Sequence, residues 1–106
     1  MLFKSKKKPS LAEFNEAQGD WYNAFYFRHK DEIDSWDNLI TASRQASQTP
    51  DKAVRLAHLQ ESLSLLDGFK DWCSQFPKGD EYFTKHCADG ERSLYARVTR
   101  ELESFK

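Results

Sequence analysis

Apolar residues recur at helical spacing over most of this chain, and no stretch alternates with the period of two that a half-buried strand requires. The clearest pattern covers residues 49–76. Leucines share one side of this segment and larger side chains continue around the next quadrant: Leu56, Leu59, Leu63, Leu65, Leu66, Phe69, Trp72, Cys73 and Phe76. This apolar arc covers about half of the circumference, whereas a helix with one neighbour needs a stripe of only ~100°. We therefore predict a central helix with a partner on each side.

Local sequence signals also predict where this central helix starts. Thr49 is a favourable N-cap residue, Pro50 suits the first helical position, and Asp51 suits the positive end of the helix dipole. A helix that starts here follows the preceding one after a very short turn, which requires antiparallel packing.

Two helices are predicted before this turn. Ser10 and Glu13 form a capping-box pattern, which begins a short helix that Gly19 can end. Asp20 can cap a longer helix over residues 21–47, where the apolar positions stay in phase throughout. Because Leu11 and Phe14 keep the same phase, one bent helix over residues 10–48 is an alternative. The length of such a helix, about 57 Å, exceeds a compact domain of this size and favours two helices.

The last helix is predicted after the turn at residues 76–79. Asp80 is its expected cap, Asp89 and Gly90 are a possible interruption, and its apolar seam consists of Phe83, Cys87, Leu94, Val98, Leu102 and Phe105. The predicted fold is therefore all-α: a three-helix antiparallel up-down-up bundle with a short extra N-terminal helix. Residues 10–106 are expected to form a single domain, preceded by a flexible basic tail at residues 1–9.

Charge divides the chain into these same two parts. Lys4, Lys6, Lys7 and Lys8 place four positive charges on the first nine residues, so the remainder is mildly acidic although the total is −1. An acidic body makes nucleic-acid binding unlikely, and no apolar run is long enough for a signal peptide or a membrane span. Two cysteines without a secretion signal indicate reduced thiols and a cytoplasmic protein.

Each of the three histidines is followed three residues later by an acid, a spacing that places the pair on one helical face. The predicted antiparallel register keeps His29 and His58 at different levels of the bundle. We therefore predict no metal site, and no cofactor motif is present. A buried polar site remains possible where His29 and Glu32 enter the aromatic arc at the level of Cys87. A thiol, an imidazole and a carboxylate can act together as a cysteine nucleophile, its general base and the group that orients the base.

The densest feature is the aromatic run at residues 21–27. Most of its rings fit the core arc, but Phe27 falls on the polar side and Tyr26 at the edge. On the last helix, Tyr82 and His86 fall outside the apolar seam. These four residues are the candidate partner-binding patch, which a homodimer would cover unless the helix at residues 11–18 covers it within the monomer.

The predicted function is a non-enzymatic protein–protein interaction module, such as a small cytosolic adaptor, regulator or inhibitor whose protein partner the sequence does not identify. Two alternatives remain. One is a nucleic-acid-associated regulator that uses the lysine tail, and the other is a cysteine-dependent enzyme built on His29, Glu32 and Cys87.

Overall fold

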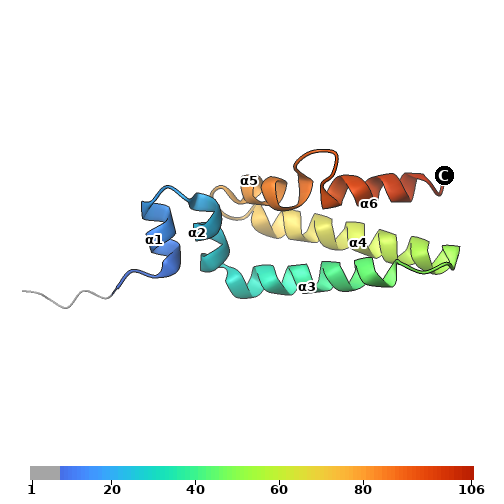
Figure 1. The fold of residues 1–106 in the computed structure, drawn as a ribbon, viewed down its shortest axis with the longest axis horizontal. Coiled ribbons are helices and arrows are strands. Elements are labelled where there is room, and N and C mark those ends of the chain that lie inside the picture. The colour runs from blue at the N-terminus through green and yellow to red at the C-terminus, as the bar shows by residue number, and fades with distance from the viewer. Residues whose placement is uncertain (1–7) are drawn as a thin grey trace, which may run out of the picture. The chain divides into compact units, whose positions relative to one another are not determined.

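A computed structural model describes residues 8–106, so most of the predicted basic tail lies outside the described residues. Over this range the chain is all-helical and contains no strand, which confirms the predicted class. The helices are α1 (Leu11–Ala17), α2 (Trp21–Arg28), α3 (Lys30–Ala46), α4 (Lys52–Cys73), α5 (Gly79–Phe83), the π-helix η1 (Thr84–Ala88) and α6 (Leu94–Glu103). Figure 1 shows their order along the chain.

The chain divides into two compact units. The first ends at Ile33 and contains α1, α2 and the first turn of α3, and the second spans Asp34–Lys106. The prediction of a single domain over residues 10–106 stays a prediction, and the two units are described separately below.

Both predicted helix starts in the first unit are confirmed. The Ser10 hydroxyl accepts the Glu13 backbone N–H at 3.1 Å, and the Glu13 carboxylate accepts the Ser10 N–H at 2.9 Å, which completes the capping box. Asp20 caps α2 by accepting the Asn23 N–H at 3.3 Å. Between the helices, Gly19 adopts φ +84°, a left-handed conformation that glycine tolerates and that ends α1 where predicted.

The predicted continuous helix over residues 21–47 is wrong, because the backbone leaves helical geometry at His29. This residue has φ −123° and ψ 30°, and its N–H is shared between the carbonyls of Phe25 (3.1 Å) and Tyr26 (3.2 Å). Two acids, Asp31 and Glu32, then occupy the first turn of α3, where they favour a new start. The apolar phase continues across the break, which is why periodicity alone could not locate it.

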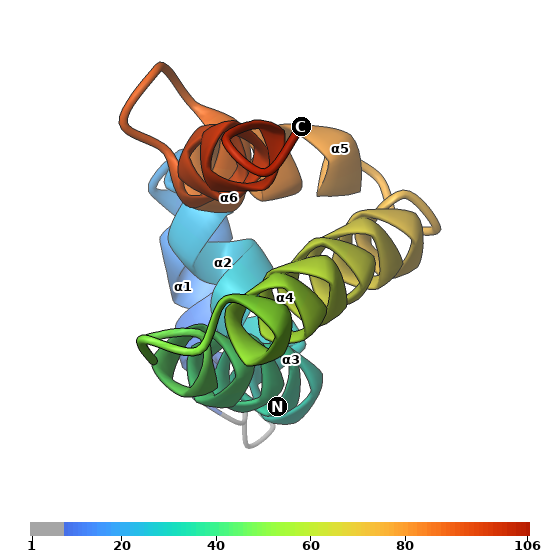
Figure 2. The ribbon, with the colours of Figure 1, turned by 90° about the vertical axis from the view of Figure 1, so that its right-hand side faces the viewer.

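In the second unit, α3 lies along one side of α4 and α6 along another (Figures 1 and 2). In this unit, the buried residues of α3 and of the turn that follows it are Ile40, Ser43 and Ser47. The hydroxyls of Ser43 and Ser62 are 2.7 Å apart, and each also lies within hydrogen-bond distance of a carbonyl of its own helix, that of Ile40 or His58. One hydroxyl donates to the other, which in turn donates to its own carbonyl. Because both hydroxyls have hydrogen-bond partners, these polar side chains can be buried where the two helices meet. Leu39, expected in the apolar arc, lies a quarter turn from Ile40 and is 52% exposed.

The start of α4 differs from the prediction by two residues. Asp51 is the N-cap, and its carboxylate accepts the Val54 N–H at 3.0 Å. Thr49 instead accepts the Asp51 N–H at 3.3 Å and stabilises the turn. A carboxylate gains more than a hydroxyl from the unpaired N–H groups at a helix start, so the acid takes the cap position.

The predicted last helix is divided into three pieces. Asp80 is not its cap, because α5 already begins at Gly79, after the left-handed Lys78. A Cβ atom on Gly79 would collide with the Cys73 carbonyl group, so only glycine fits here. The helix then widens into η1 and breaks after Ala88, near the predicted interruption. Gly90 adopts φ +88° within the loop, which extends away from the helices in Figures 1 and 2.

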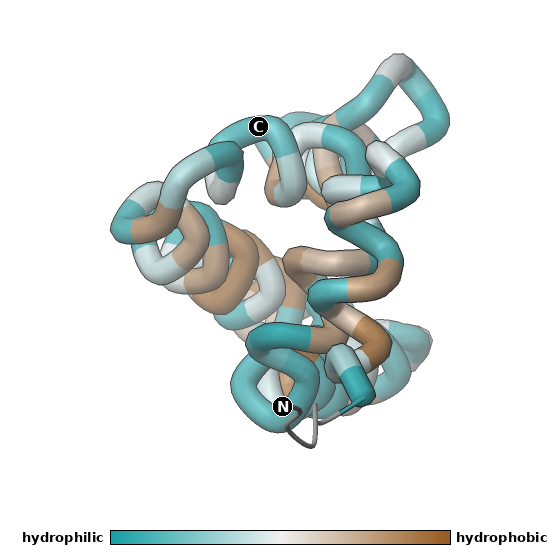
Figure 3. The backbone as a smooth tube through the Cα atoms, turned by 90° about the vertical axis from the view of Figure 1, so that its left-hand side faces the viewer, coloured by the Kyte–Doolittle hydropathy of each residue, from teal (hydrophilic) through white to brown (hydrophobic). Residues whose placement is uncertain are grey.

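The core of the second unit centres on Phe69, which has no exposed surface. Its ring lies 5.8–6.1 Å, centroid to centroid, from the rings of Trp36, Trp72, Phe83 and His86. Leu59, Leu66 and Cys73 of α4 are also fully buried, as its apolar arc predicts. Figure 3 shows hydrophobic and hydrophilic residues alternating along the helices, as expected when each helix buries one face.

Candidate functional site

Helix α1 presents its large apolar residues outward. Its one buried residue is Ala12, whereas the Leu11 and Phe14 side chains are each 52% exposed. These two are three residues apart and are therefore neighbours on the helix surface. In the sequence both residues only keep the apolar phase of the following helix, so their exposure is a finding of the structure. We refer to Leu11 and Phe14 as the α1 apolar face.

The contacts between α1 and α2 explain why this face is outward. The Glu16 carboxylate accepts the Arg28 guanidinium at 3.0 Å, which ties the last turn of α1 to the last turn of α2. Glu16 lies near the Ala12 side of α1 and on the other side from Phe14. An ion pair and a small residue therefore face α2, and the apolar face is left on the surface.

Phe27 is a further large hydrophobic side chain with high exposure among the described residues of the first unit, at 38%. It contacts Tyr26, whose ring centroid is 5.1 Å away and which is half-buried. The Lys30 ammonium group lies 5.9 Å from the Tyr26 ring centroid, within cation–π range. The exposure of Phe27 and the edge position of Tyr26 agree with the sequence-based placement of both residues.

Tyr82 does not lie on the surface, where the sequence placed it. Its side chain is 1% exposed and stacks on His86 with ring centroids 5.3 Å apart. The His86 Nε2 atom lies 3.1 and 3.3 Å from the two carboxylate oxygens of Asp37 on α3. Tyr82 lies in α5, and the predicted seam joined α5 to α6 at α-helical spacing. That spacing does not hold in η1 or in the non-helical residues 89–93, so the seam positions are displaced.

The three residues of the predicted buried polar site belong to different units: His29 and Glu32 to the first, and Cys87 to the second. Glu32 is exposed rather than enclosed by the aromatic arc. Burial lowers the pKa of His29 below its ordinary value, against the opposing effect of the Glu32 charge, and Arg28 lowers it further. His29 also packs on Phe25, at a centroid distance of 4.8 Å.

Neither cysteine has the character of a nucleophile. Burial raises the pKa of Cys87 to about 12, and the Asp37 charge and Cys73 raise it further. The pKa of Cys73 is also raised to about 12, again chiefly by burial, with contributions from Asp80 and Asp37. A reactive cysteine requires the opposite environment, which lowers the thiol pKa. Both thiols therefore stay protonated at neutral pH.

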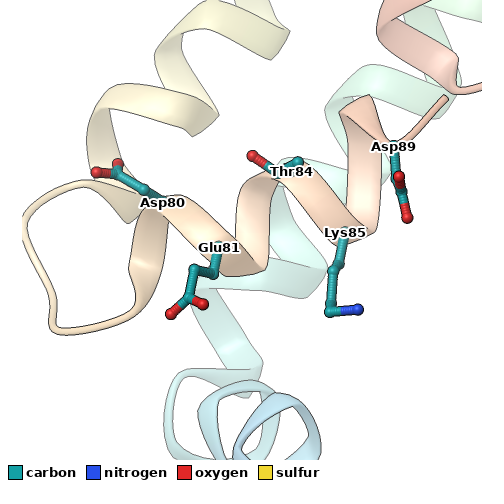
Figure 4. Close-up of a pocket in the computed structure, with 5 residues that line it drawn as sticks. All are labelled: Asp80, Glu81, Thr84, Lys85 and Asp89. Atoms are coloured by element: carbon teal, nitrogen blue, oxygen red, sulfur yellow. The ribbon is translucent and has the colours of Figure 1, made fainter.

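A shallow hollow of about 380 Å³ lies beside α5 and η1, lined by Asp80, Glu81, Thr84, Lys85 and Asp89. In Figure 4, Glu81 and Lys85 extend to the same side of this segment. Three carboxylates and one ammonium group disfavour an anion. Among residues 8–106, no three His, Cys, Asp or Glu side chains are grouped so that they could hold a metal ion.

Interactions between distant parts of the sequence were not anticipated, and two of them bring polar groups of α3 together with other helices. The pairs Asp37–His86 and Ser43–Ser62 are separated by 49 and 19 residues. Ser43 and Ser47 did carry a signal, because Ser43 lies three and ten residues, and Ser47 seven and fourteen residues, after the buried Ile40 and Ile33. Apolar residues are expected at these spacings. No comparable signal marked Asp37, which is one of many acids in the chain.

No protein-family model matches this chain, and neither do the curated proteins or solved structures with which it was compared. A search of the described helices for a membrane span also gave none, since each is too short or too polar to cross a bilayer.

Proposed function

We propose that this protein is a non-enzymatic protein–protein interaction module that acts in the cytoplasm and binds its partner through the first unit. The observation that carries the proposal is the α1 apolar face. A helix of seven residues is marginal by itself, and this one buries an alanine while it exposes a leucine and a phenylalanine. Exposing these two side chains to water is unfavourable in free energy, and a partner that covers them removes this penalty.

The distribution of exposed side chains supports the same surface. Among residues 8–106, the large hydrophobic residues with high exposure are Leu11, Phe14 and Phe27 in the first unit, and Leu39 and Val54 in the second. The first unit therefore holds three of the five, although it is much the shorter one. Phe27 and its neighbour Tyr26 extend the candidate surface, whereas the burial of Tyr82 argues against a contact there.

In this proposal, the second unit is the scaffold. Helix α3, helix α4 and the α5–η1–α6 segment would form the three antiparallel, up-down-up members of a bundle, with α1 as the short extra helix. The Ser43–Ser62 hydrogen bond joins α3 to α4, and the Arg44–Glu101 ion pair, 3.2 Å long, joins α3 to α6. Tyr95 on α6 also donates to Asp67 on α4 at 3.3 Å. The raised pKa values of both thiols favour this reading over a cysteine-dependent enzyme.

Affinity capture with matched variants tests the proposal. The parent protein is compared with the double variant Leu11→Ser/Phe14→Ser, and the control is Leu39→Ser/Val54→Ser, which removes apolar residues of 52% and 42% exposure from the second unit. The parent and the control should capture the same protein from a native lysate, and the α1 variant should lose it. Purified partner should then bind the α1 variant more weakly in a direct titration.

Circular dichroism of all three proteins shows whether each remains folded. Equal capture by the α1 variant and the parent would exclude the α1 apolar face as the binding surface. Loss of capture in the control alone would move the surface to the second unit.

A further inference from the structure

Helix α3 buries little apolar surface in the second unit, although it lies along α4 (Figure 1). Among residues 34–46, Ile40 is the only buried apolar residue, and Trp36 is half-buried, with its ring 5.9 Å from the Phe69 ring. By contrast, four apolar residues of α4 have no exposed surface: Leu59, Leu66, Phe69 and Cys73. Because apolar burial is a main source of local stability, residues 34–46 are held less firmly than α4.

Polar pairs add to this attachment near both ends of the segment. The two carboxylate oxygens of Asp37 lie 3.1 and 3.3 Å from the Nε2 atom of His86 on η1. The Arg44 guanidinium pairs with Glu101 of α6 at 3.2 Å. All four side chains are partly exposed. Polar pairs of this kind contribute only modestly to stability, because water can replace either partner.

The hydrogen bond between Ser43 and Ser62 is buried, but it can also open without leaving a polar group unpaired. The Ser43 hydroxyl lies 3.0 Å from the Ile40 carbonyl oxygen, and the Ser62 hydroxyl lies 2.9 Å from that of His58. Each hydroxyl therefore keeps a partner in its own helix when the two helices separate. The usual penalty for breaking a buried hydrogen bond, which is an unsatisfied donor or acceptor, is avoided.

We propose that residues 34–46 of α3 form a strap that opens and closes over the aromatic core around Phe69, while α4 and α5 remain packed together. Opening removes the Trp36 ring from Phe69 and from Gly68, where a Cβ atom would lie only 3.0 Å from that ring. Phe69 keeps its contact with Phe83 of α5, at 5.8 Å, so the core survives the opening.

The strap is a conformational device of the second unit, and it does not depend on the α1 apolar face. The non-helical residues 47–51 connect it to α4 and provide the hinge. In the closed state, Trp36 covers one side of Phe69, and in the open state that side is accessible. The position of the strap therefore controls access to the aromatic core.

Hydrogen exchange of the backbone amides in the full chain, measured by mass spectrometry of peptides, tests the strap. After correction for intrinsic rates, residues 34–46 should exchange about tenfold faster or more than residues 59–73 of α4, because the strap opens without unfolding α4. Equal rates in the two segments would overturn the proposal, since α3 and α4 would then open only together.

A reversible cross-link shows whether this exchange requires detachment from α4. The Ser43 and Ser62 hydroxyl oxygens are 2.7 Å apart, so the variant Ser43→Cys/Ser62→Cys places two thiols within reach of a disulfide. Once the bond is confirmed by mass, the exchange rates of the two segments should become similar, and reduction of the same sample should restore the difference. A difference that persists in the oxidised protein would overturn the strap.

The polar pairs are tested without a cross-link. The variant Asp37→Asn/Arg44→Gln should raise the ratio of the two exchange rates several-fold, because the strap opens more often. The matched control is Tyr95→Phe, which removes a hydrogen bond to Asp67 between α6 and α4 and should keep the ratio of the parent. An equal rise in the control would mean that any lost polar contact loosens the whole unit, and the strap would be wrong.

Discussion

The two compact units of this protein use aromatic residues in different ways. In the second unit, Phe69 is fully buried and contacts four other rings, so that its aromatic cluster joins α3, α4, α5 and η1. In the first unit, Phe25 is buried, but Phe14 and Phe27 remain exposed. The same residue type therefore supplies core packing in one unit and accessible surface in the other.

The difference shows that the first unit is organised by local interactions. Its helices are seven and eight residues long, and their ends are fixed by a capping box, an aspartate cap and one surface ion pair. Interactions of this kind contribute about 1 kcal/mol or less each. The second unit adds interactions between residues far apart in the sequence, and buried rings contribute several times more. We therefore expect the first unit to tolerate surface changes that the second does not.

The largest predicted effect contrasts one phenylalanine from each unit. Phe69→Ala should reduce the free energy of unfolding by about 3–5 kcal/mol, because it removes a fully buried ring with four ring neighbours. Phe14→Ala, which truncates a half-exposed ring, should change it by about 0.5 kcal/mol or less. Urea unfolding monitored by circular dichroism measures both. Similar losses for the two variants would contradict the division into a buried and an accessible aromatic set.

Local sequence signals predicted the helical class and several helix ends because caps and left-handed glycines act within a few residues. The capping box at Ser10, the Asp20 cap and the end of α1 at Gly19 are examples. The half-circle of apolar residues on α4 likewise predicted the burial of Leu59, Leu66 and Phe69. The division of the final segment was predicted only as a possibility, since Asp89 and Gly90 permit a loop without requiring one.

The candidate site was predicted less well, because exposure depends on which neighbour each helical face meets. Phe27 was placed on the surface by its angle alone. Leu11 and Phe14 keep the apolar phase of the following helix, but the turn at Gly19 separates α1 from α2, and both side chains are 52% exposed. Tyr82 was misplaced because the predicted seam assumed one continuous α-helix, whereas η1 and the non-helical residues 89–93 separate α5 from α6. The Asp37–His86 pair requires the packing of α3 on η1, which no local pattern encodes.

The second prediction concerns the buried thiols of the second unit. The pKa values of Cys73 and Cys87 are raised from 9.0 to about 12, chiefly by burial. At pH 8 the folded protein should therefore contain about a thousandfold less thiolate than the unfolded chain, and thiol-reactive reagents should label it correspondingly slowly. Labelling followed by mass spectrometry, with and without denaturant, measures this. Rapid labelling of folded Cys87 would support the enzyme alternative instead.

The raised pKa values of the same thiols predict that the folded protein loses stability at alkaline pH. A raised pKa in the folded state means that the folded protein keeps a proton that the unfolded chain releases. The stability from this effect is fully present below about pH 9 and is lost as the pH rises toward 12. Cys87→Ala should flatten this part of the pH profile of the melting temperature. If the melting temperature of this variant falls with alkaline pH as steeply as that of the parent, the Cys87 thiol does not contribute to the pH dependence of stability.

The smallest predicted effect is the response of the first unit to acid, through His29. Burial lowers the pKa of this residue in the folded state below its ordinary value of 6.5. The unfolded chain therefore binds a proton more readily than the folded protein, and stability should fall as the pH is lowered through about 6.5. His29→Gln should reduce the acid-induced drop in melting temperature between neutral and mildly acidic pH.

The His58→Gln variant controls for the loss of any one histidine, because His58 lies on α4 in the second unit, where it pairs with Glu61 at 3.4 Å. A nuclear magnetic resonance titration of the His29 ring in the folded parent gives the direct measurement, and its midpoint should lie below 6.5. A midpoint above this value would mean that the Glu32 charge outweighs burial. The first unit would then be stabilised rather than weakened by acid, and the two units would respond to a rise in pH with the same sign.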